Sequence, residues 1–194
     1  MQAKRIVSIS SAALLIAAVW TIHEAAAQDE RRVDLSPRSV LSQRIGLQEI
    51  TIVYHRPGVN DPNPASDTHG EPREIWGGVV PYGRVWRAGA NENTTIKFES
   101  AVTIEGKELD AGTYGFFVIP TESEWTLVFS KTSTAWGHFG YNQEQDALRV
   151  TITPRDAPSE ARLRCGFEDL TATSATAYLT WAGRKGAFKI TLQD

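Results

Sequence analysis

Cysteine is almost absent from this chain of 194 residues, which has only Cys165. One thiol cannot form an intramolecular disulfide, and its isolation excludes zinc ribbons, CxxC redox centres and cysteine-rich scaffolds. An excess of charge is absent too, since the formal net charge is -3. The sequence therefore gives no electrostatic reason to expect a nucleic acid as a partner. The hydrophobic fraction of 41% is too high for a disordered chain.

The motifs of several enzyme classes are also missing. The sequence has no G-x-S-x-G elbow, no P-loop, no dinucleotide fingerprint and neither H-x-H nor H-E-x-x-H. Cys165 alternates with Arg162 and Arg164 on the apolar side of an expected strand, which favours a core thiol over a nucleophile. The sequence thus names no reaction, and we expect no cofactor.

A long hydrophobic run occurs once, close to the start of the chain. Residues 6–22 follow Lys4 and Arg5 and precede the alanines at 25–27, with a polar His-Glu pair between. A charged head, an apolar run and small residues are typical of a bacterial secretory signal, here residues 1–27 with cleavage near Ala27/Gln28. An uncleaved anchor is the alternative, although the run holds three serines and a threonine. We expect a periplasmic or secreted protein without membrane insertion after cleavage.

The rest of the chain has the period-2 alternation of β-strands. Alternating apolar and polar positions recur in short segments separated by Gly and Pro turns, as in residues 50–55, 94–99, 125–130, 148–153 and 177–181. This pattern predicts an all-β fold, a single antiparallel β-sandwich of jelly-roll type with nine or ten strands. We expect a flexible N-terminal arm over residues 28–37 and one domain over residues 38–194. Two long loops, 56–90 and 131–146, interrupt the strands and are candidates for function.

The segment 75–98 has the most unusual composition, with aromatic residues among glycines followed by arginine, asparagine and glutamate. Aromatic rings offer stacking surfaces, Arg matches carboxylates or phosphates, and Asn and Glu form hydrogen bonds. Together with two aromatic residues of the second loop, it supplies the predicted ligand-binding residues: Trp76, Tyr82, Trp86, Arg87, Asn91, Glu92, Trp136 and Tyr141. The alternative is a buried Arg87–Glu92 ion pair, with the tryptophans in the core.

The chain resembles a known bacterial family over roughly residues 35–192. The similarity rests on five segments, SPRSVLSQRIGLQEITIVYHRP, IWGGVVPYGRVWRAGANENTTIKF, GKELDAGTYGFFVIP, EWTLVFSK and WGHFGYNQEQDALRV. They look like successive motifs of the bacterial domain of unknown function 2911. The resemblance implies export and one β-domain, but it supplies no catalytic residues. The chain departs from the usual pattern after Arg56-Pro57, where it carries the longer stretch NDPNPASDTHGEPRE.

Metal sites are two further possibilities. His55, His69 and His138 could together hold zinc or copper, but their spacing matches no ligand motif. The oxygen-rich stretch 60–67 lacks the glycine and terminal glutamate of a calcium loop, and turn-forming side chains explain it as well. We therefore predict no metal.

Three functions remain open from the sequence. The first is a cell-envelope module that binds a polar small molecule, such as a glycan. The second is an envelope structural or interaction domain. The third is a hydrolase or lyase that uses Glu92 or a histidine as acid or base with Arg87 as anion stabiliser. The third requires Glu92 and one histidine to meet within a cleft. The oligomeric state stays open.

Overall fold

The computed structural model describes residues 34–193, and from Leu35 onward they form one compact unit. Twelve strands and one short 3₁₀ helix make up the described chain. In chain order the elements are β1 (Arg38–Ile45), β2 (Gln48–His55), β3 (Thr94–Phe98), β4 (Val102–Ile104), β5 (Lys107–Leu109), β6 (Gly112–Pro120), β7 (Trp125–Ser130), η1 (Gln143–Gln145), β8 (Asp146–Ile152), β9 (Arg155–Asp156), β10 (Arg164–Glu168), β11 (Ser174–Trp181) and β12 (Arg184–Leu192).

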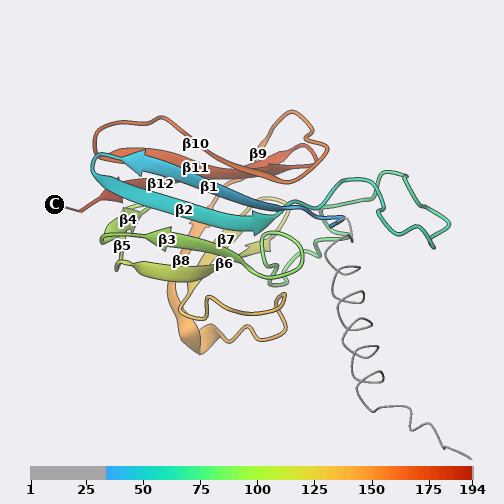
Figure 1. Cartoon of the computed structure of the whole chain (residues 1–194), viewed down its shortest axis with the longest axis horizontal. Coiled ribbons are helices and arrows are strands. Elements are labelled where there is room, and N and C mark those ends of the chain that lie inside the picture. Colours follow the sequence, from blue (N-terminus) through green and yellow to red (C-terminus); the bar gives the residue numbers. More distant parts are fainter. Residues whose placement is uncertain (1–33, 194) are drawn as a thin grey trace, which may run out of the picture. The chain divides into compact units, whose positions relative to one another are not determined.

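The strands form two antiparallel sheets, traced in Figure 1. The first has the order β1-β2-β3-β6-β7-β8, and the second has the order β10-β11-β12-β4-β5 with β9 paired to β12. The predicted all-β fold is confirmed, whereas the sandwich and jelly-roll assignments stay predictions. The predicted count of nine or ten strands is wrong. The two missing strands are β1 and β9. Only one of the eight residues of β1 is buried, so its sequence shows no alternating apolar face, and β9 has only two residues.

Alternation along the strands separates a buried face of the sheet from an outer face. In β2, Ile50, Ile52 and Tyr54 are buried in the main hydrophobic cluster, so the positions between them face the opposite side of the sheet. Phe188 of β12 contacts the rings of Phe116 and Phe129 of the first sheet, at centroid distances of 5.7 and 6.0 Å. Both sheets thus share one core, in which each buried large apolar side chain contributes about 1.5–3 kcal/mol.

Four tryptophans join the first long loop to this core. The ring of Trp76 lies 5.7 Å from Trp86, 4.6 Å from Trp125 and 6.4 Å from Trp181, between ring centroids. The indole nitrogen of Trp76 donates to the Trp181 carbonyl at 3.1 Å, and that of Trp86 donates to the Gly89 carbonyl at 3.1 Å. Trp86 is therefore a core residue, and Trp76 is partly buried and packs against the core.

Two sequence predictions concern the start of the chain. The signal peptide of residues 1–27, and all but the last residues of the arm 28–37, lie outside the described residues. In the part of the chain that the structure describes, no helix has the length and hydropathy needed to cross a membrane.

Substituting Trp86 tests the cluster. Trp86 is 8% exposed, whereas Trp136 in the other loop is 64% exposed. We expect Trp86→Ala to lower the free energy of unfolding by about 3 kcal/mol, since it opens a cavity in the core. The control Trp136→Ala should change it by less than about 0.5 kcal/mol. Urea unfolding measures both, and equal losses would contradict the assignment of Trp86 to the core.

Candidate functional site

The candidate site lies on the face of the first sheet that points away from the core. Val53 and His55 alternate with the buried residues of β2, so both point to this outer face. The register places Arg38 of β1 opposite His55, and Thr95 of β3 opposite Val53. Four side chains from three adjacent strands therefore meet near the ends of those strands.

A second wall comes from the loop that follows β7. The buried side-chain oxygen of Asn93 accepts a hydrogen bond from the backbone amide of Ala135 at 2.9 Å. The backbone amide of Asn93 donates to the Ala135 carbonyl at 3.1 Å. The Gly137 amide donates to the Asn91 carbonyl at 3.1 Å. These bonds pair residues 91–93 with residues 135–137. Glu92 and Trp136, far apart in the sequence, thus become neighbours.

Gly115 lets this loop cross the sheet closely. A Cβ atom at Gly115 would lie 2.8 Å from the side-chain nitrogen Nδ2 of Asn93, and closer still to the Thr132 carbonyl oxygen. Any side chain there would force the loop away from β6. The only residue type without a side chain therefore stands where the loop rests on the sheet.

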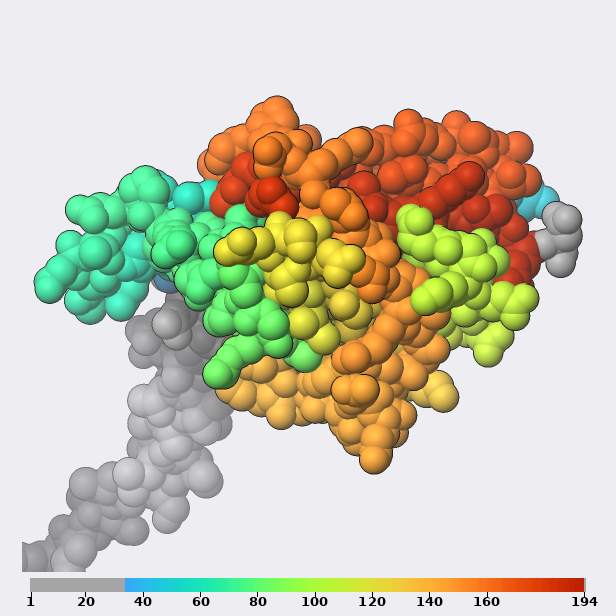
Figure 2. Space-filling view, turned by 180° about the vertical axis from the view of Figure 1, so that it is seen from behind, coloured from blue at the N-terminus to red at the C-terminus, as the bar shows by residue number. Residues whose placement is uncertain are grey.

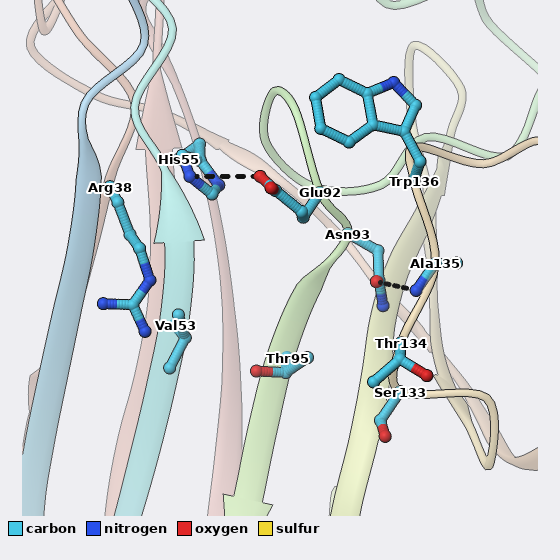
Figure 3. Close-up of a pocket in the computed structure, with 10 residues that line it drawn as sticks. All are labelled: Arg38, Val53, His55, Glu92, Asn93, Thr95, Ser133, Thr134, Ala135 and Trp136. Carbon is cyan, nitrogen blue, oxygen red and sulfur yellow. Dashed lines mark hydrogen bonds and ion pairs between the residues drawn. The ribbon is translucent and has the colours of Figure 1, made fainter. Parts of the chain in front are cut away.

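These elements enclose a pocket of about 520 Å³. Figure 3 shows its lining, with the strands on one side and the loop after β7 on the other. The lining residues are Arg38, Val53, His55, Glu92, Asn93, Thr95, Ser133, Thr134, Ala135 and Trp136. The volume is within the range of sites that hold small molecules, about 300–1,000 Å³.

The most specific contact in the pocket joins His55 to Glu92. The distance from His55 Nε2 to Glu92 Oε2 is 3.3 Å, with the imidazole side chain 10% exposed and the carboxylate side chain 56% exposed. A buried ring therefore holds a carboxylate that remains open to solvent (Figure 3). An imidazole that contacts a carboxylate is a combination able to transfer protons or to bind hydroxyl groups.

Three further kinds of group line the pocket. Arg38 is exposed and supplies a guanidinium group, Thr95, Ser133 and Thr134 supply hydroxyl groups, and Trp136 supplies a ring. The indole of Trp136 is 64% exposed, a high value for so large an apolar side chain. The pocket thus combines an aromatic stacking surface with a cationic group, an anionic group and several hydroxyl groups.

The family model described as a protein of unknown function, DUF2911, matches residues 36–190. The chain belongs to this family. No curated protein and no solved structure matches it. The resemblance seen in the sequence motifs is thereby confirmed.

The eight residues predicted for the ligand site of this DUF2911 protein do not gather around one pocket. Only Glu92 and Trp136 line the pocket of His55. Trp76 and Trp86 pack in the tryptophan cluster, and the partly exposed Tyr82 packs its ring over Gly77. Asn91 adopts a positive φ of 56° and uses its backbone carbonyl to hold the loop. The physical reason is that backbone pairing brings Glu92 to Trp136, while burial draws the rings of Trp76 and Trp86 toward the core.

Arg87 and Tyr141, also predicted for the site, have other surroundings. Arg87 and Glu92 form no ion pair, and neither is fully buried, so the alternative of a buried Arg87–Glu92 clamp is wrong. Tyr141 donates to Asp146 at 2.7 Å and accepts from Arg149 at 2.8 Å, and its ring lies 5.3 Å from Phe117. Burial raises the pKa of the Tyr141 hydroxyl, with a further contribution from Asp146. Tyr141 thus anchors the end of the loop rather than lining the pocket of His55.

The candidate metal ligands are separated. His55, His69 and His138 line three different pockets, and within residues 34–193 no group of His, Cys, Asp or Glu has a metal-binding arrangement. Asp61 accepts from the Asn63 amide at 3.0 Å and from the Thr68 hydroxyl at 2.8 Å, and these bonds lower its pKa to about 2. Its carboxylate therefore stabilises a turn.

Sequence reasoning missed Arg38 as a site residue and considered His55 only as a metal ligand or an acid–base group. Strand alternation predicts that His55 does not share the buried face of Ile52 and Tyr54, and this was a usable signal that His55 points to the outer face of the sheet. Arg38 had no such signal, because its position depends on the pairing of β1 with β2. Cys165 is buried and its pKa is raised to about 12 by burial, which agrees with a core thiol.

Gly115→Ala tests the seating of the loop. We expect the new methyl group to displace residues 131–137 and to lower the free energy of unfolding by about 1–3 kcal/mol. Hydrogen exchange at the Ala135 and Gly137 amides should accelerate together with this loss. Gly140→Ala is the matched control, because nothing lies within 4 Å of a Cβ atom there. Unchanged exchange at both amides in Gly115→Ala would contradict the prediction.

Proposed function

We propose that this DUF2911 protein is an exported cell-envelope module that binds a polar small molecule, such as a glycan, in the pocket of His55 and Glu92. The observation that carries the proposal is the convergence of Arg38, His55, Glu92 and the exposed ring of Trp136 on one pocket of about 520 Å³. We interpret the two sheets as a β-sandwich that acts as the scaffold.

The chemistry of the pocket suits a hydroxylated ligand. Sugar rings present C–H faces that pack on an indole, and their hydroxyl groups need both donors and acceptors. Trp136 supplies the flat surface, Glu92 accepts hydrogen bonds, and Arg38 donates them. Because Glu92 is 56% exposed, its oxygens are accessible to a ligand while one of them contacts His55.

Support for export comes from the sequence alone. Lys4 and Arg5 precede the apolar residues 6–22, and three alanines follow at 25–27. This order is typical of a secretory signal. A protein exported in this way meets the glycans of the envelope, which fits a binding function.

Binding to soluble sugars tests the proposal. A panel of mono- and disaccharides, N-acetylglucosamine oligomers and uronic acid oligomers is titrated by calorimetry. We expect at least one class to bind, and Trp136→Ala to weaken its binding about tenfold through loss of stacking. Phe139→Ala is the matched control, because Phe139 is 80% exposed in the same loop but does not line the pocket.

A second pair of variants separates charge from stacking. Glu92→Gln and Arg38→Met should each weaken the same ligand, since each removes a polar contact in the pocket. The matched controls are Glu122→Gln in the turn after β6 and Arg44→Met, which shares the exposed face of β1 with Arg38. Binding that is absent for every sugar, or that survives in all three pocket variants, would refute the proposal.

Acid–base catalysis is the second candidate, and the 3.3 Å contact between His55 and Glu92 favours it. A histidine and Glu92 lie together in a cleft, as the sequence hypothesis of an enzyme required, but Arg87, its expected anion stabiliser, lines a different pocket. In this role the pair would activate a water molecule as general base and acid.

Hydrolysis of nitrophenyl esters and glycosides between pH 4 and 9 tests this candidate. If the pair is catalytic, Glu92→Gln should lower kcat about 10²–10⁴-fold and remove one limb of the pH profile. Glu122→Gln should leave both unchanged. Turnover no faster than the buffer reaction, or insensitive to Glu92→Gln, would exclude catalysis of these substrates by the pair.

A further inference from the structure

A second pocket, of about 340 Å³, lies between the loop 56–90 and the end of β11. It shares no lining residue with the pocket of His55. Arg73, Trp86, Arg87, His138 and Trp181 are among its lining residues. Figure 2 shows the segment 73–90, in green, against the yellow residues of the β6–β7 region, which agrees with the bridge between Trp86 and Val118.

Among residues 34–193, two side chains that line this pocket each carry a buried donor without a hydrogen-bond partner. These donors are the Nε of Arg87 and the indole Nε1 of Trp181. Trp181 is 1% exposed, so its indole nitrogen is shielded from bulk solvent and depends on an acceptor inside the protein or its pocket. The indole nitrogens of Trp76 and Trp86, in the same cluster, do find carbonyl acceptors. Since a buried donor without an acceptor costs about 1–3 kcal/mol, two such donors at one pocket require an explanation.

The charges around the pocket indicate what would supply the acceptor. Its lining includes Arg73, Arg87 and His138 but no carboxylate. Arg87 forms no ion pair with any residue in the 34–193 range, and its burial lowers the pKa of the guanidinium group. Arg73 donates to the Gly58 carbonyl at 2.7 Å, which holds the loop and keeps a second cation beside the pocket.

Gly137 leaves the space that Arg87 occupies. A Cβ atom at Gly137 would lie 2.8 Å from a terminal nitrogen of Arg87, and Gly137 has a positive φ of 69°. The guanidinium group is thus held between the two long loops. The rings of Trp86 and Trp181, stacked at 6.1 Å with an interplanar angle of 19°, give the pocket an apolar wall.

We propose that this pocket binds an anionic oxygen group, a carboxylate or a phosphate, which accepts hydrogen bonds from Arg87 and from the indole of Trp181. The guanidinium fork suits either group, because both present pairs of oxygen atoms. The stacked tryptophans contact the apolar part of the ligand. This site is separate from the pocket of His55, which contains the carboxylate of Glu92.

The indole resonances in a ¹H–¹⁵N spectrum test the proposal directly. Purified ¹⁵N-labelled protein is titrated with sodium acetate and, separately, with sodium phosphate, with chloride added to constant ionic strength. The Trp181 resonance is assigned by its loss in Trp181→Phe. We expect it to move saturably with at least one anion, while the Trp125 resonance stays in place. Acetate alone would identify a carboxylate site, and phosphate alone a phosphate site.

Two variants and two controls decide whether Arg87 binds the anion. Arg87→Met should weaken the response of the Trp181 resonance about tenfold or more, because a charge-assisted bond is lost. The exposed Arg84→Met and the Glu92→Gln variant of the other pocket should leave it unchanged. Dispersed amide resonances confirm that each variant is folded. No saturable shift with either anion, or an equal shift in folded Arg87→Met, would overturn the proposal.

Discussion

The packing of four tryptophans is the interaction on which the arrangement of the long loops depends. Trp76 and Trp86 belong to the loop 56–90, whereas Trp125 and Trp181 belong to β7 and β11 of different sheets. Their contacts bury apolar area that the loop alone could not bury, and edge and stacked geometries add about 0.5–1.5 kcal/mol per pair. The cluster thereby fixes the path of the chain as it enters β3.

The position of Glu92 and Asn93 in the first pocket follows from that path. Ala88 and Asn91 have positive φ values of 53° and 56°, a strained conformation for residues other than glycine. The buried hydroxyl of Thr94 donates to the Ala88 carbonyl at 3.0 Å and stabilises this turn. Asn93 then pairs with Ala135, so one buried amide side chain connects the two loops. Glu92 is exposed above His55 because its neighbours on both sides are held by the backbone.

The two pockets differ in the balance of donors and acceptors. In the first, the carboxylate of Glu92 contacts the imidazole of His55, and hydroxyl groups line the same pocket. In the second, the Nε of Arg87 and the indole nitrogen of Trp181 have no acceptor among residues 34–193. The loop 131–146 borders both, with Trp136 at one pocket and His138 at the other. The bonds among Tyr141, Asp146 and Arg149 hold its far end.

The sequence by itself determined the all-β class, most strands and the core role of Trp125 and Trp181, because alternation is a local property of the chain. It also singled out the two loops, and it proposed Glu92 from the segment 75–98 and Trp136 from the second loop. Only the tertiary structure decided that Trp76 and Trp86 pack with Trp125 and Trp181, that Arg38 and His55 share a pocket with Glu92, and that Arg87 lines a different one. These facts depend on strand register and on pairing between distant loops. Such contacts are set by burial and hydrogen bonding across the whole domain, for which no short segment carries a signal.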